Sequence, residues 1–388
     1  MNPIQIFQPR FRKKEILEEI SQCLDKGWTG MGFKTEEFEK EWNEYTGLVH
    51  SHFLSSNTVG LHLSLKIFKE EYGWKDGDEI ITTPLTFVST NHSILYENLT
   101  PVFADVDDYL CLDPKSVLEN ITKKTKAVVF VGMGGNPGQL DKVEEICKSH
   151  NLKLILDAAH MSGTFVLRNG KKEHVGKEAD VTVFSFQAVK NLPTADSGMI
   201  CFKSKDLDSK ARKYSWLGID KDTYSRSNSR GNYSWKYDVP FVGYKYHGNS
   251  IMASIAKVQL RYLDVDNQKR NVISEKYLDF VNTIPNLEYI KTSDYCEVPS
   301  RHLFQIYSKD DLIDRDTIIA GLHDRKIYPG VHYIDNRSYK MFKQKEDTCK
   351  KASFYSDRII SLPLHLNLSE EDIIRICDSL EEIIRKNV

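Results

Sequence analysis

Residues 126–157, KAVVFVGMGGNPGQLDKVEEICKSHNLKLILD, place two short apolar runs on either side of a longer amphipathic segment. The run KAVVFVGM is almost continuously apolar, and so is LKLILD, which is typical of strands buried on both faces. Between them, LDKVEEICKSHN has apolar residues at helical spacing. Strands separated by a helix of this length predict a mostly parallel sheet covered by helices on both sides.

The same alternation extends outward from about residue 58 to residue 200. Upstream, NTVGLHLSLKIFKE and TNHSILYEN are helical patterns, while DEIITTPLTF and TPVFADVD are strand-like. Downstream, DVTVFSF is one further buried strand. We therefore predict an α/β fold.

After residue 200 the pattern changes. Residues 215–250 are rich in Ser, Tyr, Arg and Gly and predict loops and short hairpins, and loops of that length are usually functional. We predict one long helix from residue 251 to about 284, followed by a smaller α+β unit. The predicted domains are residues 1–250, an N-terminal arm with a large domain, and residues 251–388, the linking helix with a small C-terminal domain.

Composition narrows the class of protein. The 388 residues include 53 basic and 55 acidic ones, so no overall charge favours a nucleic acid or an anionic membrane as partner. The seven cysteines are scattered, without a CxxC pair or a His/Cys cluster, which predicts reduced thiols and no metal site. No apolar run approaches the roughly 20 residues of a membrane span, and the N-terminus does not resemble a signal peptide. We expect a soluble cytoplasmic protein.

Three polar residues follow predicted strands at the sheet edge where α/β proteins bind ligands: Asp157, Ser185 and Lys190. Singly, Asp157 is readily a turn or cap residue, and Lys190 a solvated lysine. Together they suit pyridoxal phosphate, because a lysine amine forms a Schiff base with its aldehyde and a carboxylate keeps the ring nitrogen protonated.

The segment SSNTVGLHL, residues 55–63, leads small polar residues directly into a helix. Backbone N–H groups at a helix start, helped by hydroxyl and amide side chains, bind phosphate. The alternative for this segment is a plain N-cap.

Six collinear motifs resemble the DegT/StrS family of sugar-nucleotide aminotransferases, which are fold-type I enzymes that use pyridoxal phosphate. The motifs are SSNTVGLHLSL, GDEIITTPLTFVSTNHSILY, PVFADVD, LDAAH, FSFQAVKN and GVHY, and the resemblance covers almost the whole chain. It implies that residues 1–250 bind the cofactor.

The resemblance implies a role for each matching residue. Lys190 matches the lysine that binds the cofactor covalently, and Asp157 the carboxylate that pairs with the ring nitrogen. His160 matches the residue beside the cofactor's 3-hydroxyl, and Phe87 the aromatic residue stacked on the ring.

Further matches concern the phosphate and the substrate. Asn57, Thr58 and Ser185 match the phosphate-binding residues. His332, in GVHY, matches a histidine that faces the substrate, and Thr29, in GWTG, lies on the N-terminal loop that borders the sugar.

The chain departs from the family pattern at three places. Lys245, in GYKY, stands where many relatives have an asparagine that reaches the partner subunit's cofactor phosphate. Asp196 and Ser197, in PTADSG, replace a glutamate and a glycine. Gly132 and Gly134 stand where relatives often have His and Tyr, which predicts a more open pocket wall.

The implied activity is transfer of an amino group from L-glutamate to a nucleotide-linked keto-deoxy sugar for amino-sugar biosynthesis, with ping-pong kinetics through pyridoxamine phosphate. A homodimer with active sites shared between subunits is also implied. Two alternatives stay open: an aminotransferase acting on a keto-cyclitol, and a cofactor-binding regulatory protein without turnover. The family's dehydratases have a histidine in place of Lys190, so this lysine argues against them.

Overall fold

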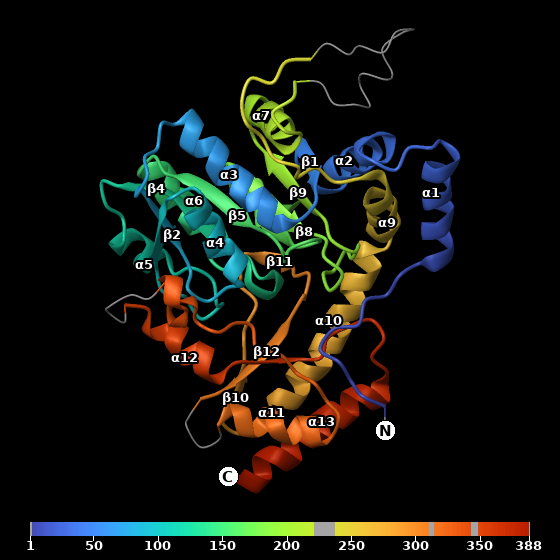
Figure 1. Ribbon diagram of the computed structural model, residues 1–388. Helices are drawn as coiled ribbons and strands as arrows, with labels where there is room; N and C mark the ends of the chain where they lie inside the picture. The colour runs from blue at the N-terminus through green and yellow to red at the C-terminus, as the bar shows by residue number, and fades with distance from the viewer. Residues whose placement is uncertain (1, 221–236, 310–313, 343–347, 388) are drawn as a thin grey trace.

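The computed structural model describes residues 2–220, 237–309, 314–342 and 348–387 (Figure 1). Its main sheet has the strand order β1-β9-β8-β5-β4-β2-β3. Strand β9 is antiparallel to both neighbours, and the other paired strands are parallel, so the predicted mostly parallel sheet is confirmed. The strands are β1 (His50–Leu54), β2 (Glu79–Thr82), β3 (Thr100–Phe103), β4 (Thr125–Val131), β5 (Lys153–Asp157), β8 (Val181–Ser185) and β9 (Gly198–Phe202).

Helices cover both faces of this sheet. Along β4, Val128 and Phe130 belong to one buried cluster and Ala127 and Val129 to another, because successive side chains of a strand point to opposite faces. The second cluster includes residues of α3 (Asn57–Glu71), α4 (Val88–Tyr96) and α7 (Lys205–Ser215). The first includes residues of α2 (Phe33–Thr46), α5 (Pro114–Glu119), α6 (Leu140–Ser149) and α9 (Ser250–Leu260).

A third buried cluster surrounds the small sheet β10-β12-β13 at the other end of the molecule (Figure 1). The N-terminal arm joins it: Ile4 is 4% exposed, and its backbone bonds to those of Lys326 and Tyr328 at 2.9 and 2.8 Å. The predicted domain boundary between residues 250 and 251 stays a prediction. The elements here are α10 (Leu263–Val281), β10 (Leu287–Tyr289), β12 (Phe304–Ser308), α11 (Arg315–Asp324), α12 (Lys350–Arg358), β13 (Ile360–Leu362) and α13 (Glu370–Asn387).

The prediction of one long helix after residue 250 is wrong. Helix α9 ends at Leu260 and α10 begins at Leu263. The two residues between them contact α1 (Lys13–Asp25): Arg261 donates a hydrogen bond to Glu19 at 2.6 Å, and the hydroxyl of Tyr262 donates one to Glu15 at 2.5 Å. The interruption therefore coincides with the docking of α1.

Some elements had no counterpart in the sequence prediction. Among the strands they include β1, β9, β10 and a second three-stranded sheet formed by β6 (Phe165–Arg168), β7 (Lys171–His174) and β11 (Cys296–Val298), and among the helices α1, α2, α5, α7 and α12. Most of the predicted loop segment, residues 221–236, lies outside the described residues. Among the helices that the structure describes, none is both long and apolar enough to cross a bilayer.

Candidate active site

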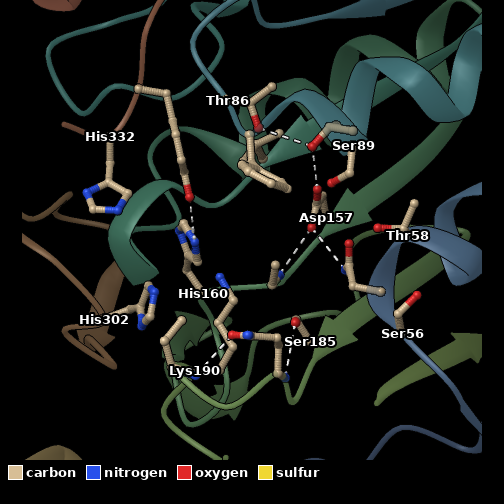
Figure 2. A pocket seen from close by; sticks show the side chains of 18 of the residues that line it. Ser56, Thr58, Thr86, Ser89, Asp157, His160, Ser185, Lys190, His302 and His332 are labelled. Carbon is tan, nitrogen blue, oxygen red and sulfur yellow. Dashed lines mark hydrogen bonds between the residues drawn. The ribbon is translucent and has the colours of Figure 1, made fainter. Parts of the chain in front are cut away.

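A pocket of about 420 Å³ lies at the carboxyl ends of β4, β5 and β8 (Figure 2). It is where the topology of an α/β sheet places ligands. Side chains from the main sheet, the arm and the C-terminal unit line it together: Phe7, Ser56, Asn57, Thr58, Thr86, Phe87, Ser89, Thr90, Val131, Asp157, Ala159, His160, Ser185, Gln187, Val189, Lys190, Asp196, His302, His332 and Tyr333.

Asp157 ends β5 and is only 3% exposed. Its Oδ2 accepts a hydrogen bond from the hydroxyl of Thr90 at 2.8 Å, and its Oδ1 accepts the N–H of Ala159 at 3.2 Å. Burial raises the pKa of this carboxyl, although these hydrogen bonds and the charge of Lys190 oppose the shift. A cation placed beside Asp157 would therefore be strongly favoured.

The motif match predicted that the side chain of Asn57 binds the phosphate. In the structure this side chain is turned toward Asp157 instead. Its amide donates to Asp157 Oδ1 at 3.2 Å and to the carbonyl of Val183 at 3.0 Å. Both amide protons are used in this way, so the side chain holds Asp157 in place. What Asn57 offers to an anion is its backbone N–H, at the first position of α3.

The start of α3 is the part of the pocket whose geometry suits an anion. Ser56 caps the helix by accepting the N–H of Val59, and the N–H groups of the first helical residues have no intrahelical partner. Thr58 and Ser185 also line the pocket, so hydroxyl groups accompany these N–H groups. A Cβ on Gly198 would lie 2.7 Å from the backbone nitrogen of Asn57, so β9 passes this helix start at a distance that only glycine permits.

Lys190 lies in the pocket on the turn that follows β8, with its N–H bonded to the carbonyl of Gln187 at 2.8 Å. Burial lowers the pKa of its ammonium from 10.5 to about 8, and the nearby charge of Asp157 only partly offsets this. The neutral amine, which is the nucleophilic form, is therefore far more populated near neutral pH than in a solvated lysine.

His160 has a defined proton position. The backbone N–H of Gly134 donates to its Nδ1 at 3.2 Å, so the proton of the neutral ring is on Nε2, which lies 3.3 Å from the hydroxyl of Tyr333. Burial and the positive charge of Lys190 hold the pKa of this imidazole well below its usual range. His160 thus presents a neutral N–H donor to the pocket.

The prediction of a more open pocket wall at Gly132 and Gly134 is wrong, because neither glycine is among the described residues that line this pocket. A Cβ on Gly132 would lie 2.0 Å from the sulfur of Met161, so that thioether already fills the space. Gly134 has a φ of 63°, and a Cβ on it would approach Gln305 Oε1 to 3.2 Å. The glycines give room to neighbouring side chains rather than to a ligand.

Three residues of the other wall were not identified from the sequence: Phe7, His302 and Tyr333. Phe7 stacks on His302 at 5.3 Å and meets His332 edge-on at 5.6 Å between ring centroids. Tyr333 directly follows the predicted His332, so its place in the GVHY motif was a usable signal. Nothing local to Phe7 or His302 indicated a pocket residue.

The remaining predicted residues occupy different places. His332 lines the pocket, and its Nδ1 lies 2.9 Å from the hydroxyl of Ser361, while burial lowers its pKa to about 4. Phe87 is 59% exposed and lines the mouth near Tyr333. Thr29 and Lys245 are exposed outside this pocket.

The two departures after Lys190 have separate surroundings. Asp196 is exposed and lines the pocket. Ser197 is buried, and its hydroxyl pairs with that of Thr194 at 2.7 Å. Only Asp196 therefore faces a ligand.

These residues fit pyridoxal phosphate. The pocket supplies an amine for its aldehyde, a buried carboxylate for its ring nitrogen, a neutral N–H for its ring oxygen and a helix start for its phosphate. With the doubly covered, mostly parallel sheet, they define a fold-type I enzyme that depends on pyridoxal phosphate.

The chain belongs to the DegT/DnrJ/EryC1/StrS aminotransferase family, whose sequence model matches residues 11–381. It is 33% identical over 383 residues to the spore coat polysaccharide biosynthesis protein SpsC of Bacillus subtilis, covering 96% of this chain and 95% of SpsC.

Two solved structures are also similar to the chain. One is PseC of Helicobacter pylori, an aminotransferase involved in the biosynthesis of pseudoaminic acid, with a TM-score of 0.89, 26% identity and coverage of 99% of this chain and 100% of PseC. The other is Spr1654 of Streptococcus pneumoniae in its PLP form, with a TM-score of 0.88, 25% identity and coverage of 100% of both chains.

Proposed function

We propose that this protein transfers an amino group from L-glutamate to a nucleotide-linked keto-deoxy sugar, in the biosynthesis of an amino sugar for a surface polysaccharide or glycan. The names of two relatives support the sugar substrate, since SpsC is a polysaccharide biosynthesis protein and PseC acts in the synthesis of pseudoaminic acid. The observation that carries the proposal is the placement of Lys190, with its lowered pKa, in one pocket with the buried carboxylate of Asp157.

The mechanism assigns proton transfer to Lys190. When bound, pyridoxal phosphate supplies an electron-accepting ring next to the reacting carbon. The neutral amine of Lys190 takes a proton from the α-carbon of the amino donor, and in the second half-reaction its ammonium delivers a proton to the sugar carbon that receives the amine. Asp157 would hold a positive charge on the ring nitrogen, and the N–H of His160 would donate to the ring oxygen.

Binding and water exclusion fall to the other lining residues. The start of α3, with Thr58 and Ser185, would hold the phosphate, and Phe87 would cover the ring. His332 borders the substrate inside the pocket, and Thr29, which is exposed outside it, borders the sugar only where the substrate extends beyond the pocket. Phe7, which belongs to the N-terminal arm, covers one side of the pocket and limits the access of water.

We also propose a homodimer in which Lys245 reaches the partner subunit's pocket. Among the described lining residues Lys190 is the one lysine or arginine, so the described lining offers a phosphate or carboxylate no second cation. Lys245 is exposed, and its ammonium rests over the ring of Trp216 at 3.6 Å. Mixing inactive Lys190→Ala and Lys245→Ala subunits should restore activity in hybrids, whereas an absence of restoration would contradict sharing.

The proposed function is tested by a turnover screen. The holoenzyme is incubated with L-glutamate and dTDP-, UDP- or GDP-linked 4-keto and 3-keto sugars, and with a keto-cyclitol as competing acceptor. Amination of at least one nucleotide sugar is expected. Amination of the cyclitol alone would replace the proposed acceptor, and a cofactor absorbance unchanged by glutamate would indicate a protein without turnover.

The lowered pKa of Lys190 predicts a pH dependence. Only the neutral amine attacks the aldehyde, so the rate at which cofactor-free protein binds pyridoxal phosphate covalently should rise with pH and level off above about pH 8. A solvated lysine would still gain rate up to its ordinary pKa of 10.5. Stopped-flow absorbance measures the profile, and a rate that climbs steadily through pH 10 would contradict the burial of this amine.

A further inference from the structure

His302 lines the pocket, is 1% exposed and has no part in the mechanism above. It precedes β12, and its backbone N–H bonds to the carbonyl of Gly134 at 3.0 Å. Its ring lies between two others, with Phe7 on one face at 5.3 Å and His160 at 4.3 Å between ring centroids. The ring is therefore fixed in position.

A chain of amides fixes the proton of His302. The amide nitrogen of Asn267 donates to the carbonyl of Ser162 at 2.9 Å, so Asn267 turns its oxygen toward Asn191. The amide nitrogen of Asn191 donates to that oxygen at 2.7 Å and to the carbonyl of Ser300 at 2.6 Å. The oxygen of Asn191 therefore faces His302 Nδ1, at 2.9 Å, and an amide oxygen only accepts. The proton is on Nδ1.

It follows that Nε2 of His302 carries a lone pair. Burial and the positive charges around the ring, including Lys190, hold the pKa of this imidazole well below its usual range, so Nε2 is unprotonated at neutral pH. With Nδ1 bound to Asn191, Nε2 is the nitrogen left for the pocket, and it acts only as a hydrogen-bond acceptor.

The position of His302 separates it from the phosphate-binding groups. Figure 2 shows His302 and His332 on one side of the pocket and Ser56 and Thr58 on the other, with Asp157 and Lys190 between them. The phosphate-binding groups proposed above lie at the start of α3, whereas His302 packs on His160, the residue proposed for the cofactor's ring oxygen, at 4.3 Å between ring centroids. His302 therefore lies on the side of the pocket away from the phosphate, where it borders the space for the substrate.

We propose that His302 determines specificity by accepting, at Nε2, a hydrogen bond from a hydroxyl group of the sugar substrate. The inference rests on the proposed function. A bare lone pair repels keto and phosphate oxygens, so the hydroxyls are the groups of a keto sugar that satisfy it. The ammonium group of the amino-acid substrate could also donate a hydrogen bond to Nε2. The test below distinguishes this donor from a sugar hydroxyl.

Two substitutions test the roles of the two ring nitrogens separately. In His302→Asn the amide nitrogen can replace Nδ1 and keep the bond to Asn191, but the acceptor facing the pocket is lost. In His302→Gln the amide oxygen reaches the position of Nε2, while the bond to Asn191 is lost. If His302 had only a structural role, His302→Asn would be closer to the wild type than His302→Gln in stability and in activity toward both substrates. If His302 recognises the substrate, His302→Gln would have the higher kcat/KM for the sugar.

The experiment uses holoenzyme, L-glutamate and the nucleotide-linked keto sugar, among the 4-keto and 3-keto sugars of the screen above, that the wild type aminates. We expect His302→Asn to lower kcat/KM for the sugar roughly tenfold, the effect of losing one neutral hydrogen bond, and His302→Gln to recover most of it. The loss of cofactor absorbance on adding glutamate alone should keep its wild-type rate in both variants. Equal losses for the sugar in both variants, or a slowed glutamate step in His302→Asn, would overturn the proposal.

A second readout does not depend on turnover. Ring-nitrogen NMR of protein labelled at histidine, assigned by the absence of one signal set in His302→Asn, should show a proton on Nδ1 and none on Nε2. A proton on Nε2 would overturn the assignment even if the wild type aminates none of these sugars. That last outcome by itself would refute the proposed function.

Discussion

Lys190→Ala should abolish the visible absorbance of covalently bound cofactor and lower kcat by at least about 10²–10⁴-fold, the range for losing a general acid and base. The reason is that one amine serves as both nucleophile and proton carrier, and the described lining of the pocket holds no other lysine. Absorbance spectra of reconstituted protein and single-turnover rates with glutamate measure the two effects separately.

Two further variants control this result. Lys190→Arg keeps a positive charge but cannot lose its proton, so it should be as inactive as the alanine variant. Lys115→Ala removes a lysine whose side chain is 80% exposed on α5 and should leave both readouts unchanged. An absorbance band that persists in Lys190→Ala, and that denaturation does not release, would mean that another residue holds the cofactor.

Asp157→Asn should lower kcat by about 10³-fold, because an ion pair at about 4 Å and an effective dielectric constant of 20 is worth about 4 kcal/mol. The substitution keeps the shape of the side chain and its hydrogen bonds to Ala159 and Asn57, and the hydroxyl of Thr90 can reverse its direction. Steady-state rates with saturating cofactor measure the effect. A variant as fast as the wild type would remove Asp157 from the mechanism.

Stability distinguishes this role from a structural one. Burial raises the pKa of Asp157 above its unfolded value, so the carboxylate costs stability at pH values above that pKa and ceases to do so as the pH falls through it. At neutral pH the cofactor-free Asp157→Asn protein should therefore melt no lower than the wild type. Thr90→Val, which keeps the charge and removes one hydrogen bond, should have the milder effect on kcat.

The sequence predicted the sheet well because its signals are local. Each buried parallel strand, such as β4 or β5, is a short apolar run, and the helices between them have clear periodicity. The interruption between α9 and α10 could not be predicted, since it coincides with contacts to Glu15 and Glu19 on a helix more than 240 residues away along the chain.

In the candidate site, too, the residues predicted from local sequence signals differ from those that depend on long-range contacts. Asp157, Ser185 and Lys190 follow strands, so their common location followed from topology alone. The other wall depends on pairs such as Asn191 with His302, 111 residues apart, and His160 with Tyr333, 173 residues apart. Such long-range pairs cannot be predicted from the periodicity of the sequence. The hydrogen bond from the side chain of Asn57 to Asp157 likewise depends on side-chain geometry, which a sequence motif does not contain.

The arm that carries Phe7 has a consequence for biosynthesis on the ribosome. Ile4 pairs with backbone near residue 327, and Phe7 packs on His302, so this arm finds its partners only after the chain as far as residue 328 has emerged. A nascent chain with its main sheet complete would still lack this wall. Capture of the cofactor in a closed pocket therefore comes only after residues 302–333 have been translated.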